Sequence, residues 1–182
     1  MRPGPHAPIT NFKFHNPVPV IMPEVLPLPK FFFVTTGTAV SKVSDLNAFD
    51  QALMNAGIGE QNIVQVFAPS STLPRGITKM KPCEINKGAI IFCVLAEEEG
   101  TEGETVSTGI AYGFRGDGEG GFVAEGHIHG VEKSLKEILK WKLDEMAKLR
   151  DVELKNVTYK TVEITVPMDH YGACIAALVY LF

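Results

Sequence analysis

The chain has 182 residues, the size of one ordinary domain with a hydrophobic core, and its formal net charge is -4. Apolar residues make up 45% of it and charged residues 21%, a composition typical of globular proteins and unlike that of disordered chains. Seventeen basic side chains against twenty-one acidic ones give no positive field for binding nucleic acid or an anionic membrane surface. No apolar run reaches the roughly 20 residues that a membrane-spanning helix needs.

The chain has three cysteines, which are widely spaced and have apolar neighbours: Cys83, Cys93 and Cys174. No CxxC pair occurs among them, and an odd number does not make a complete disulfide frame. We predict that all three are reduced core residues, which indicates a cytoplasmic protein. The N-terminus also lacks the apolar segment of a signal peptide.

The N-terminal segment differs in composition from the rest of the chain. Eight of the twelve prolines fall within residues 1–29, so this segment cannot form a helix or a central strand. We predict that residues 1–30 form an extended or disordered arm, and that residues 31–182 form a single domain.

Regular structure is expected from the first strand, residues 31–36 (FFFVTT), onward. A helix follows over residues 46–56, begun by Ser44 or Asp45 as a cap and ended by Gly57. Its predicted buried face consists of four apolar residues at helical spacing: Leu46, Phe49, Leu53 and Ala56.

The rest of the chain reads as strands interrupted by one long helix. The helix is predicted over residues 131–150, and its apolar face consists of Val131, Leu135, Ile138, Leu139, Met146 and Leu149. The strands are predicted at residues 62–68, 89–96, 106–113, 121–127, 158–166 and 173–182. Two helices between groups of strands predict the α+β class, with largely antiparallel sheets and helices packed outside, and argue against a doubly wound parallel sheet.

Three features have more than one interpretation from the sequence alone: a serine pair and two acidic residues. The stretch APSSTLPRG (68–76) holds a serine pair between two prolines, a composition typical of a turn. Glu125 lies in the small, apolar strand GGFVAEG, where it either faces solvent by alternation or is buried. If it is buried, desolvation would keep it protonated near neutral pH and make it a usable proton donor. Asp50 has the same ambiguity on its helix.

Other candidate sites have simpler explanations. The glycine-rich GDGEGG (116–121) lacks the lysine and the spacing of a phosphate-binding loop, which favours a plain connection between strands. His127 and His129 alternate on a strand and could face one metal ion, but two ligands are too few for a zinc site. Cys93 and Cys174 have no charged neighbour in sequence that would favour a reactive thiolate.

Four segments, taken in order, resemble the pyruvoyl-dependent arginine decarboxylases. They are LNAFDQALMNAGIG (46–59), SSTLP (70–74), GGFVAEG (120–126) and YGACIAALVYLF (171–182). The resemblance runs from about Phe31 to the end of the chain and leaves the arm outside. It implies an αββα sandwich, which agrees with the α+β class predicted from the pattern of elements.

The resemblance also implies a reaction at the serine pair. The Ser70–Ser71 bond would be cut by the protein itself, giving a β chain of residues 1–70 and an α chain of residues 71–182. Ser71 would become a covalent pyruvoyl cofactor, which accepts the electrons released when L-arginine loses CO2 to form agmatine.

The resemblance assigns roles to four further residues. Glu125 corresponds to the proton donor, and Asp50 to the carboxylate that pairs with the guanidinium of arginine. Leu46 on the same helix is a substrate-binding position. Asn62 corresponds to an asparagine that orients the cleavage site, although the segment FAP (67–69) adds length between it and Ser71.

Family members are homotrimers, sometimes stacked into hexamers, with active sites between subunits. The resemblance therefore implies that Asp50 of one subunit serves the Ser71 strand of the next. Three alternatives remain open from the sequence. The chain is a decarboxylase for another cationic amino acid such as histidine, a non-catalytic trimeric member, or a metal-binding protein built on His127 and His129.

Overall fold

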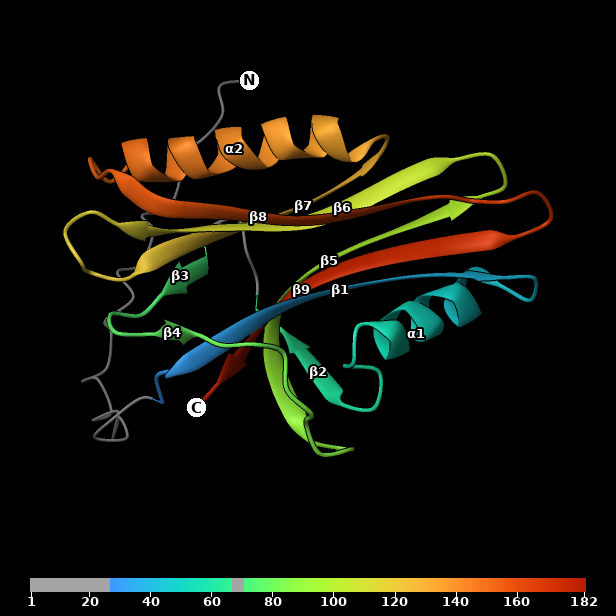
Figure 1. Cartoon of the computed structure of the whole chain (residues 1–182), viewed down its shortest axis with the longest axis horizontal. Helices are drawn as coiled ribbons and strands as arrows, with labels where there is room; N and C mark the ends of the chain where they lie inside the picture. The colour runs from blue at the N-terminus through green and yellow to red at the C-terminus, as the bar shows by residue number, and fades with distance from the viewer. Residues whose placement is uncertain (1–26, 67–70) are drawn as a thin grey trace, which may run out of the picture.

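The computed structural model describes residues 27–66 and 71–182, and gives these two ranges two helices and nine strands (Figure 1). In chain order the elements are β1 (Phe31–Ser41), α1 (Asp45–Asn55), β2 (Asn62–Gln65), β3 (Ser71–Leu73), β4 (Thr78–Lys79), β5 (Ile90–Thr101), β6 (Thr105–Arg115), β7 (Gly121–His129), α2 (Glu132–Lys148), β8 (Leu154–Thr165) and β9 (Tyr171–Leu181). The α+β class predicted from the sequence is confirmed.

The strands form two sheets. The five-stranded sheet has the order β2-β5-β9-β1-β4, and the four-stranded sheet has the order β3-β7-β6-β8. Most neighbouring strands are antiparallel, such as β1 and β9, which pair from Phe31 opposite Leu181 to Ser41 opposite Tyr171. The two parallel pairs, β2 with β5 and β1 with β4, lie at the edges of the five-stranded sheet.

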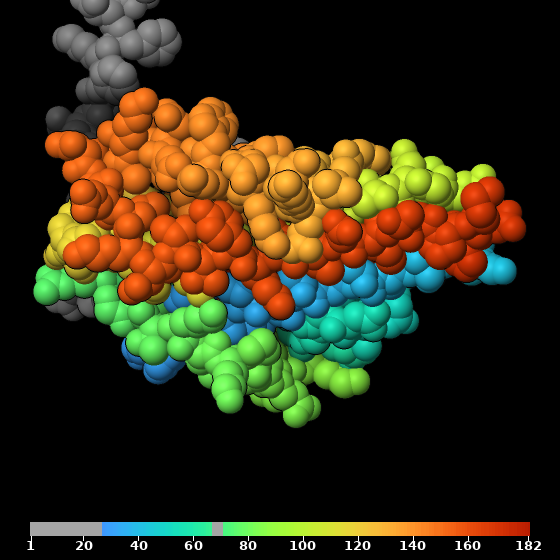
Figure 2. All heavy atoms as spheres, turned by 45° about the horizontal axis from the view of Figure 1, so that its top comes forward, coloured from blue at the N-terminus to red at the C-terminus, as the bar shows by residue number. Residues whose placement is uncertain are grey.

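The two sheets pack face to face, with one helix on each outer side (Figures 1 and 2). Helix α1 packs against the five-stranded sheet, and α2 packs against the four-stranded sheet. Strand β9 shows why this order buries both faces of a sheet. Side chains alternate along it: Ala177 and Val179 face α1, whereas Leu178 and Tyr180 face the other sheet.

Helix α1 begins and ends as predicted. The Ser44 hydroxyl accepts a hydrogen bond from the main-chain N–H of Asn47 at 3.2 Å, and Gly57 adopts a positive φ of 77° after the last turn. Its buried face differs from the prediction, because Leu46 is 69% exposed whereas Ala48 and Ala52 are fully buried. The apolar stripe is thus rotated toward the alanines.

The alanines are buried because α1 lies unusually close to β1. A Cβ atom added to Gly37 of β1 would lie 2.0 Å from the main-chain oxygen of Ala52. Only glycine on the strand and a small residue on the helix allow this distance. Leu46 precedes Ala48 by two residues, which places it about 200° around the helix from Ala48 and therefore away from the sheet.

Helix α2 covers the four-stranded sheet with residues at helical spacing. Its buried side chains are Leu135, Leu139, Leu143, Met146 and Ala147. Three residues that the sequence pattern placed on this face lie mainly outside it: Val131, Ile138 and Leu149 are 49%, 38% and 80% exposed. Val131 and Leu149 cap the two ends of the helix, where the sheet no longer lies beneath it.

Two short strands were not predicted, β3 and β4. Ser71 lies in β3, so this serine is part of a strand and not of a turn, whereas Ser70 lies outside the described residues. Pro74 follows directly after β3 and cannot donate to a neighbouring strand. Strand β2 ends at Gln65, earlier than predicted, and residues 67 and 68 also lie outside the described ranges.

The three cysteines divide into two kinds. Cys93 and Cys174 are buried, as predicted, but Cys83 is exposed, so its expected core position is wrong. All three are free thiols. Burial raises the pKa of Cys93 to about 12 and that of Cys174 to about 11, which agrees with the prediction that neither is a reactive thiolate.

Most of the predicted arm lies outside the described residues, which begin at Pro27. Residues 27–30 have no regular structure, and the main-chain N–H of Lys30 donates to the Leu181 carbonyl at 2.8 Å. Neither of the two helices in the described ranges is long and apolar enough to span a bilayer.

Candidate active site

The candidate site lies where the chain passes from one sheet to the other. Strand β2 belongs to the five-stranded sheet and β3 to the four-stranded sheet, so the crossing falls between Val66 and Ser71. Ser71 opens β3 and pairs with Val123 of β7. Ser70, and with it the predicted scissile bond, lies outside the described residues.

The Ser71 side chain is buried and has no partner. The residue is 5% exposed, and its hydroxyl forms no hydrogen bond within residues 27–66 and 71–182. Alternation along β3 puts Ser71 on the same face as Leu73, which packs in the core between the sheets. Leaving a buried hydroxyl unpaired costs about 1–3 kcal/mol, and such groups call for a functional explanation.

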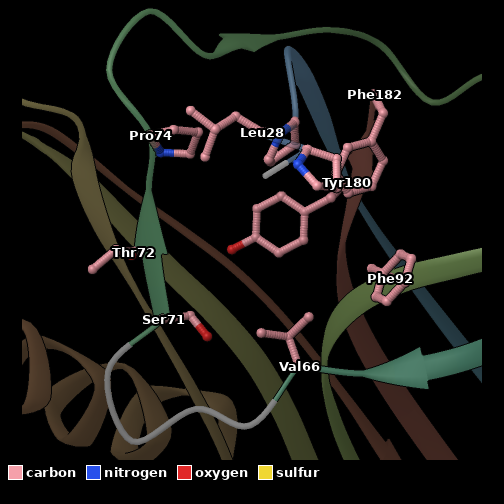
Figure 3. Close-up of a pocket in the computed structure, with 10 residues that line it drawn as sticks. Leu28, Val66, Ser71, Thr72, Pro74, Phe92, Tyr180 and Phe182 are labelled. Carbon is pink, nitrogen blue, oxygen red and sulfur yellow. The ribbon is translucent and has the colours of Figure 1, made fainter. Parts of the chain in front are cut away.

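The Ser71 hydroxyl points into a cavity of about 540 Å³, named here the Ser71 pocket (Figure 3). Its lining consists of Pro27, Leu28, Pro29, Val66, Ser71, Thr72, Pro74, Phe92, Tyr180 and Phe182. No Asp, Glu, Lys or Arg side chain of the described residues lines it. The Tyr180 hydroxyl also points into the pocket (Figure 3), and burial raises its pKa to about 12, so it remains a neutral donor.

Glu125 lies on the same face of the four-stranded sheet as Ser71. Ser71 is opposite Val123, and Glu125 follows Val123 by two residues on β7. Diagonal neighbours of this kind lie about 7–8 Å apart in antiparallel sheets. The fold therefore brings together the two residues that the sequence analysis identified as cofactor precursor and proton donor.

The surroundings of Glu125 are charged, in contrast to the apolar character of its strand. The Glu125 side chain is 21% exposed, and its Oε1 lies 3.9 Å from Lys142 Nζ on α2. The same ammonium donates to the main-chain oxygen of Glu125 at 2.7 Å. The apolar neighbours Phe122 and Ala124 point to the opposite face, toward α2. Glu125 is thus half-buried beside a cation.

Glu125 borders a second hollow of about 410 Å³, named here the acidic cleft. It is lined by Gln65, Leu95, Glu97, Glu98, Glu99, Glu125 and His127, from strands β2, β5 and β7. Burial, followed by the nearby carboxylates of Asp45, Glu97 and Glu98, raises the pKa of Glu99. Four glutamates around one hollow create a negative potential that favours a cationic ligand.

The histidine pair lies at the same edge and contacts carboxylates. Glu98 Oε2 is 2.8 Å from His127 Nδ1, and Glu98 Oε1 is 3.5 Å from His129 Nε2. His129 also lies 3.6 Å from Glu104. These contacts join β7 to β5, and hence one sheet to the other. The described part of the chain holds no group of three or more His, Cys, Asp or Glu placed to bind a metal ion.

Three predicted site residues lie away from these hollows. Asp50 and Leu46 are exposed on α1 and line neither the Ser71 pocket nor the acidic cleft. Asn62 is exposed at the far end of β2 from the crossing, and its Nδ2 donates to the Gly88 carbonyl at 2.8 Å. Of the predicted site residues that the structure describes, only Ser71 and Glu125 lie on the same face of one sheet within a single chain.

Two residues of the site were not found from the sequence, Tyr180 and Lys142. Tyr180 is the penultimate residue of the largely apolar strand β9. Its hydroxyl was a signal in the sequence that the side chain reaches a polar feature. Lys142 carries no such signal, because it is one of several lysines on α2. Only the packing of α2 on β7 brings it to Glu125.

Comparison with known proteins identifies the family of the chain. The family model described as pyruvoyl-dependent arginine decarboxylase matches residues 31–182. The chain belongs to this family. The match begins at the first residue of β1 and leaves residues 1–30 outside.

Curated relatives carry the name pyruvoyl-dependent arginine decarboxylase. The protein from Pyrococcus abyssi is 34% identical over 137 residues, which cover 74% of this chain and 84% of the relative. The one from Thermococcus kodakarensis is 33% identical over 153 residues, covering 83% and 94%. That from Methanothermobacter thermautotrophicus is 30% identical over 149 residues, covering 81% and 94%. The likeness to pyruvoyl-dependent arginine decarboxylases thus extends over nearly their whole length.

Proposed function

We propose that this protein decarboxylates L-arginine to agmatine and CO2, using a pyruvoyl group made from Ser71. The observation that supports this most directly is the buried, unpartnered Ser71 hydroxyl on the same face as Glu125, in a chain of this family. The order of α1, two sheets and α2 supports the further proposal that the fold is the family's αββα sandwich.

The proposed self-cleavage uses only the atoms of the serine pair and water. Ser71 Oγ adds to the carbonyl carbon of Ser70, and the amide becomes an ester. Loss of the Ser71 α-proton then expels the Ser70 carboxylate and leaves dehydroalanine, which water converts into the pyruvoyl group and ammonia. Within residues 27–66 and 71–182 no hydrogen bond competes for the Ser71 hydroxyl, which supports its proposed attack on the preceding carbonyl.

The residues around position 71 fit a pyruvoyl group. Strand pairing with Val123 fixes the backbone there, and the Ser71 pocket offers an apolar space in front of it. When present, the group supplies an electron sink for the loss of CO2. The protein must orient the substrate, and Phe92 and Tyr180 form walls against which it can lie.

Glu125 is the proposed donor of the proton that replaces the lost carboxyl group on the α-carbon. It lies on the same face as Ser71, at the diagonal position of the neighbouring strand. Its Oε1 lies 3.9 Å from Lys142 Nζ, and the same ammonium donates a hydrogen bond to the main-chain oxygen of Glu125, so Lys142 holds the residue in place.

We propose that Asp50 and Leu46 come from a neighbouring subunit of a homotrimer, with stacking into hexamers as a further possibility for the assembly. Both residues are exposed on α1 and line neither hollow of their own chain. The exposed apolar side chains Val43, Leu46 and Met54 on or beside α1 form a surface that an oligomer would bury. The Asp50 carboxylate would then form a bidentate pair with the guanidinium.

For Asn62 we propose an indirect role in self-cleavage. Its hydrogen bond to the Gly88 carbonyl fixes the first residue of β2 beside β5. Strand β2 leads the chain into the crossing that ends at Ser71, so a fixed β2 limits where the crossing begins.

The intact mass of the denatured protein tests the proposal. We expect two chains, residues 1–70 and 71–182, the larger one blocked to N-terminal sequencing by its ketone. Ser71→Ala should remain one chain and form no agmatine. A wild-type protein that stays uncut would contradict the proposal. If it is cut, assays with arginine and with histidine identify the substrate, and preferential turnover of histidine would refute the arginine assignment.

A further inference from the structure

The Ser71 pocket combines apolar walls with very few polar groups. Phe92 and Phe182 pack edge to face at 5.7 Å between ring centres, and Leu28, Val66 and Pro74 complete the walls. The polar groups aimed into it are the hydroxyls of Ser71 and Tyr180 (Figure 3). Both residues are more than nine-tenths buried, and Ser71 Oγ has no partner in the described part of the chain. Ligand pockets commonly have this composition.

The charges around Ser71 separate the two ends of an amino-acid substrate. The acidic cleft would repel a carboxylate, because four glutamates line it. The Ser71 pocket has no Asp or Glu side chain among its described residues, so it offers no partner for a guanidinium. A substrate that reacts at position 71 therefore places its α-carboxyl group on the side of the Ser71 pocket.

We propose that the Tyr180 hydroxyl donates a hydrogen bond to the α-carboxyl group of the substrate and orients it for departure. This inference rests on the proposed function, since it assumes an amino-acid substrate at position 71. Strand β9 holds Tyr180 rigidly, opposite Phe32 on one side and Phe92 on the other. The hydroxyl points into the same pocket as Ser71 (Figure 3).

A single neutral donor suits the departure of CO2. The apolar side chains of the walls offer a carboxylate no hydrogen-bond donor, whereas the CO2 formed from it is neutral, so these walls favour the product side of the bond cleavage. An arginine or lysine here would stabilise the carboxylate and oppose this effect. The phenol orients the group with one hydrogen bond, and because its pKa is about 12 it keeps its proton.

Tyr180→Phe removes only the hydroxyl and provides the test. We expect complete self-cleavage by mass and a KM for arginine raised about tenfold to hundredfold, the usual effect of losing a hydrogen bond to a charged group. Inhibition by agmatine, which lacks the carboxyl group, should stay unchanged. Tyr112→Phe is the matched control, because Tyr112 is equally buried between the sheets but does not line the Ser71 pocket.

The possible outcomes are distinct. An unchanged KM, or an equal loss of agmatine binding, would overturn the role of Tyr180 while leaving the proposed function intact. A folded Tyr180→Phe protein that does not cleave would also overturn it, because the hydroxyl would then act in self-cleavage. Tyr180→Met packs differently without a hydroxyl and should reproduce the same KM change if Tyr180→Phe folds poorly. Failure of the wild-type protein to cleave or to use arginine concerns the proposed function alone.

Discussion

The Ser71 pocket and the acidic cleft meet at the same crossing between the sheets, yet they differ completely in character. Val66 lines the first and its neighbour Gln65 lines the second. One hollow has apolar walls and hydroxyls, and the other has four glutamates and a histidine. The difference shows how the edge of a two-sheet fold can place an apolar and a charged environment on the two sides of one reacting position.

Changing Glu125 to Gln is the largest perturbation of the acidic cleft. We expect decarboxylation to fall about 10²- to 10⁴-fold, the usual contribution of a general acid, while self-cleavage at Ser71 continues. Agmatine formation and intact mass measure the two effects separately. Glu153→Gln, at an exposed position that lines neither hollow, is the control and should have a small effect. Normal turnover by Glu125→Gln would remove this residue from the mechanism.

The Asp50→Ala variant tests whether the acidic cleft alone binds the guanidinium of arginine or whether the Asp50 carboxylate on α1 is needed. We expect KM for arginine to rise about 100-fold, because a paired carboxylate is lost, and self-cleavage to be complete. Asp45→Asn on the same helix is the control. If sites are shared between subunits, a mixed oligomer of Asp50→Ala and Glu125→Gln chains should regain part of the activity. An unchanged KM would instead assign the guanidinium to the glutamates of the cleft.

Lys142→Met removes the cation beside Glu125. Lys142 Nζ donates a hydrogen bond to the main-chain oxygen of Glu125, which ties the end of β7 to α2. We expect kcat for agmatine formation to fall about threefold to tenfold while self-cleavage continues, because one hydrogen bond that positions Glu125 is lost.

A control separates this effect from a general change of charge on α2. Lys140→Met alters the same helix at an exposed position, and its kcat should match that of the wild type. A kcat that is the same for Lys142→Met and wild type would show that the hydrogen bond to the Glu125 main chain does not position the carboxyl group.

The sequence predicted the class of the fold because long elements have clear periodicity. Both helices and the long strands were found, since each buries a regular face. The short strands β3 and β4 were not predicted, because two or three residues between prolines and glycines show no hydrophobic periodicity. The burial of Ala52 was not predicted either, because it depends on the close contact of Ala52 with Gly37, which is distant in the chain.

The site was predicted unevenly for a related reason. Ser71 and Glu125 were identified through family motifs, and the register of β3 on β7 brings them to one face. Tyr180 and Lys142 reach the site from β9 and α2, by packing across layers. Such contacts leave no local pattern, so they emerge only from the assembled fold.

The position of β1 has a consequence for how the protein folds. β1 lies between β9 and β4, and β2 lies beside β5, so both strands before Ser71 pair with strands that follow it. A chain cut before Ser71 would therefore be held together by a shared sheet and core. Once unfolded, its two pieces would have to meet again in solution, and refolding would slow as the protein is diluted. The uncut chain folds in a single-molecule step, but the cut protein does not. Each molecule would therefore fold by this concentration-independent route only once, before it is cleaved.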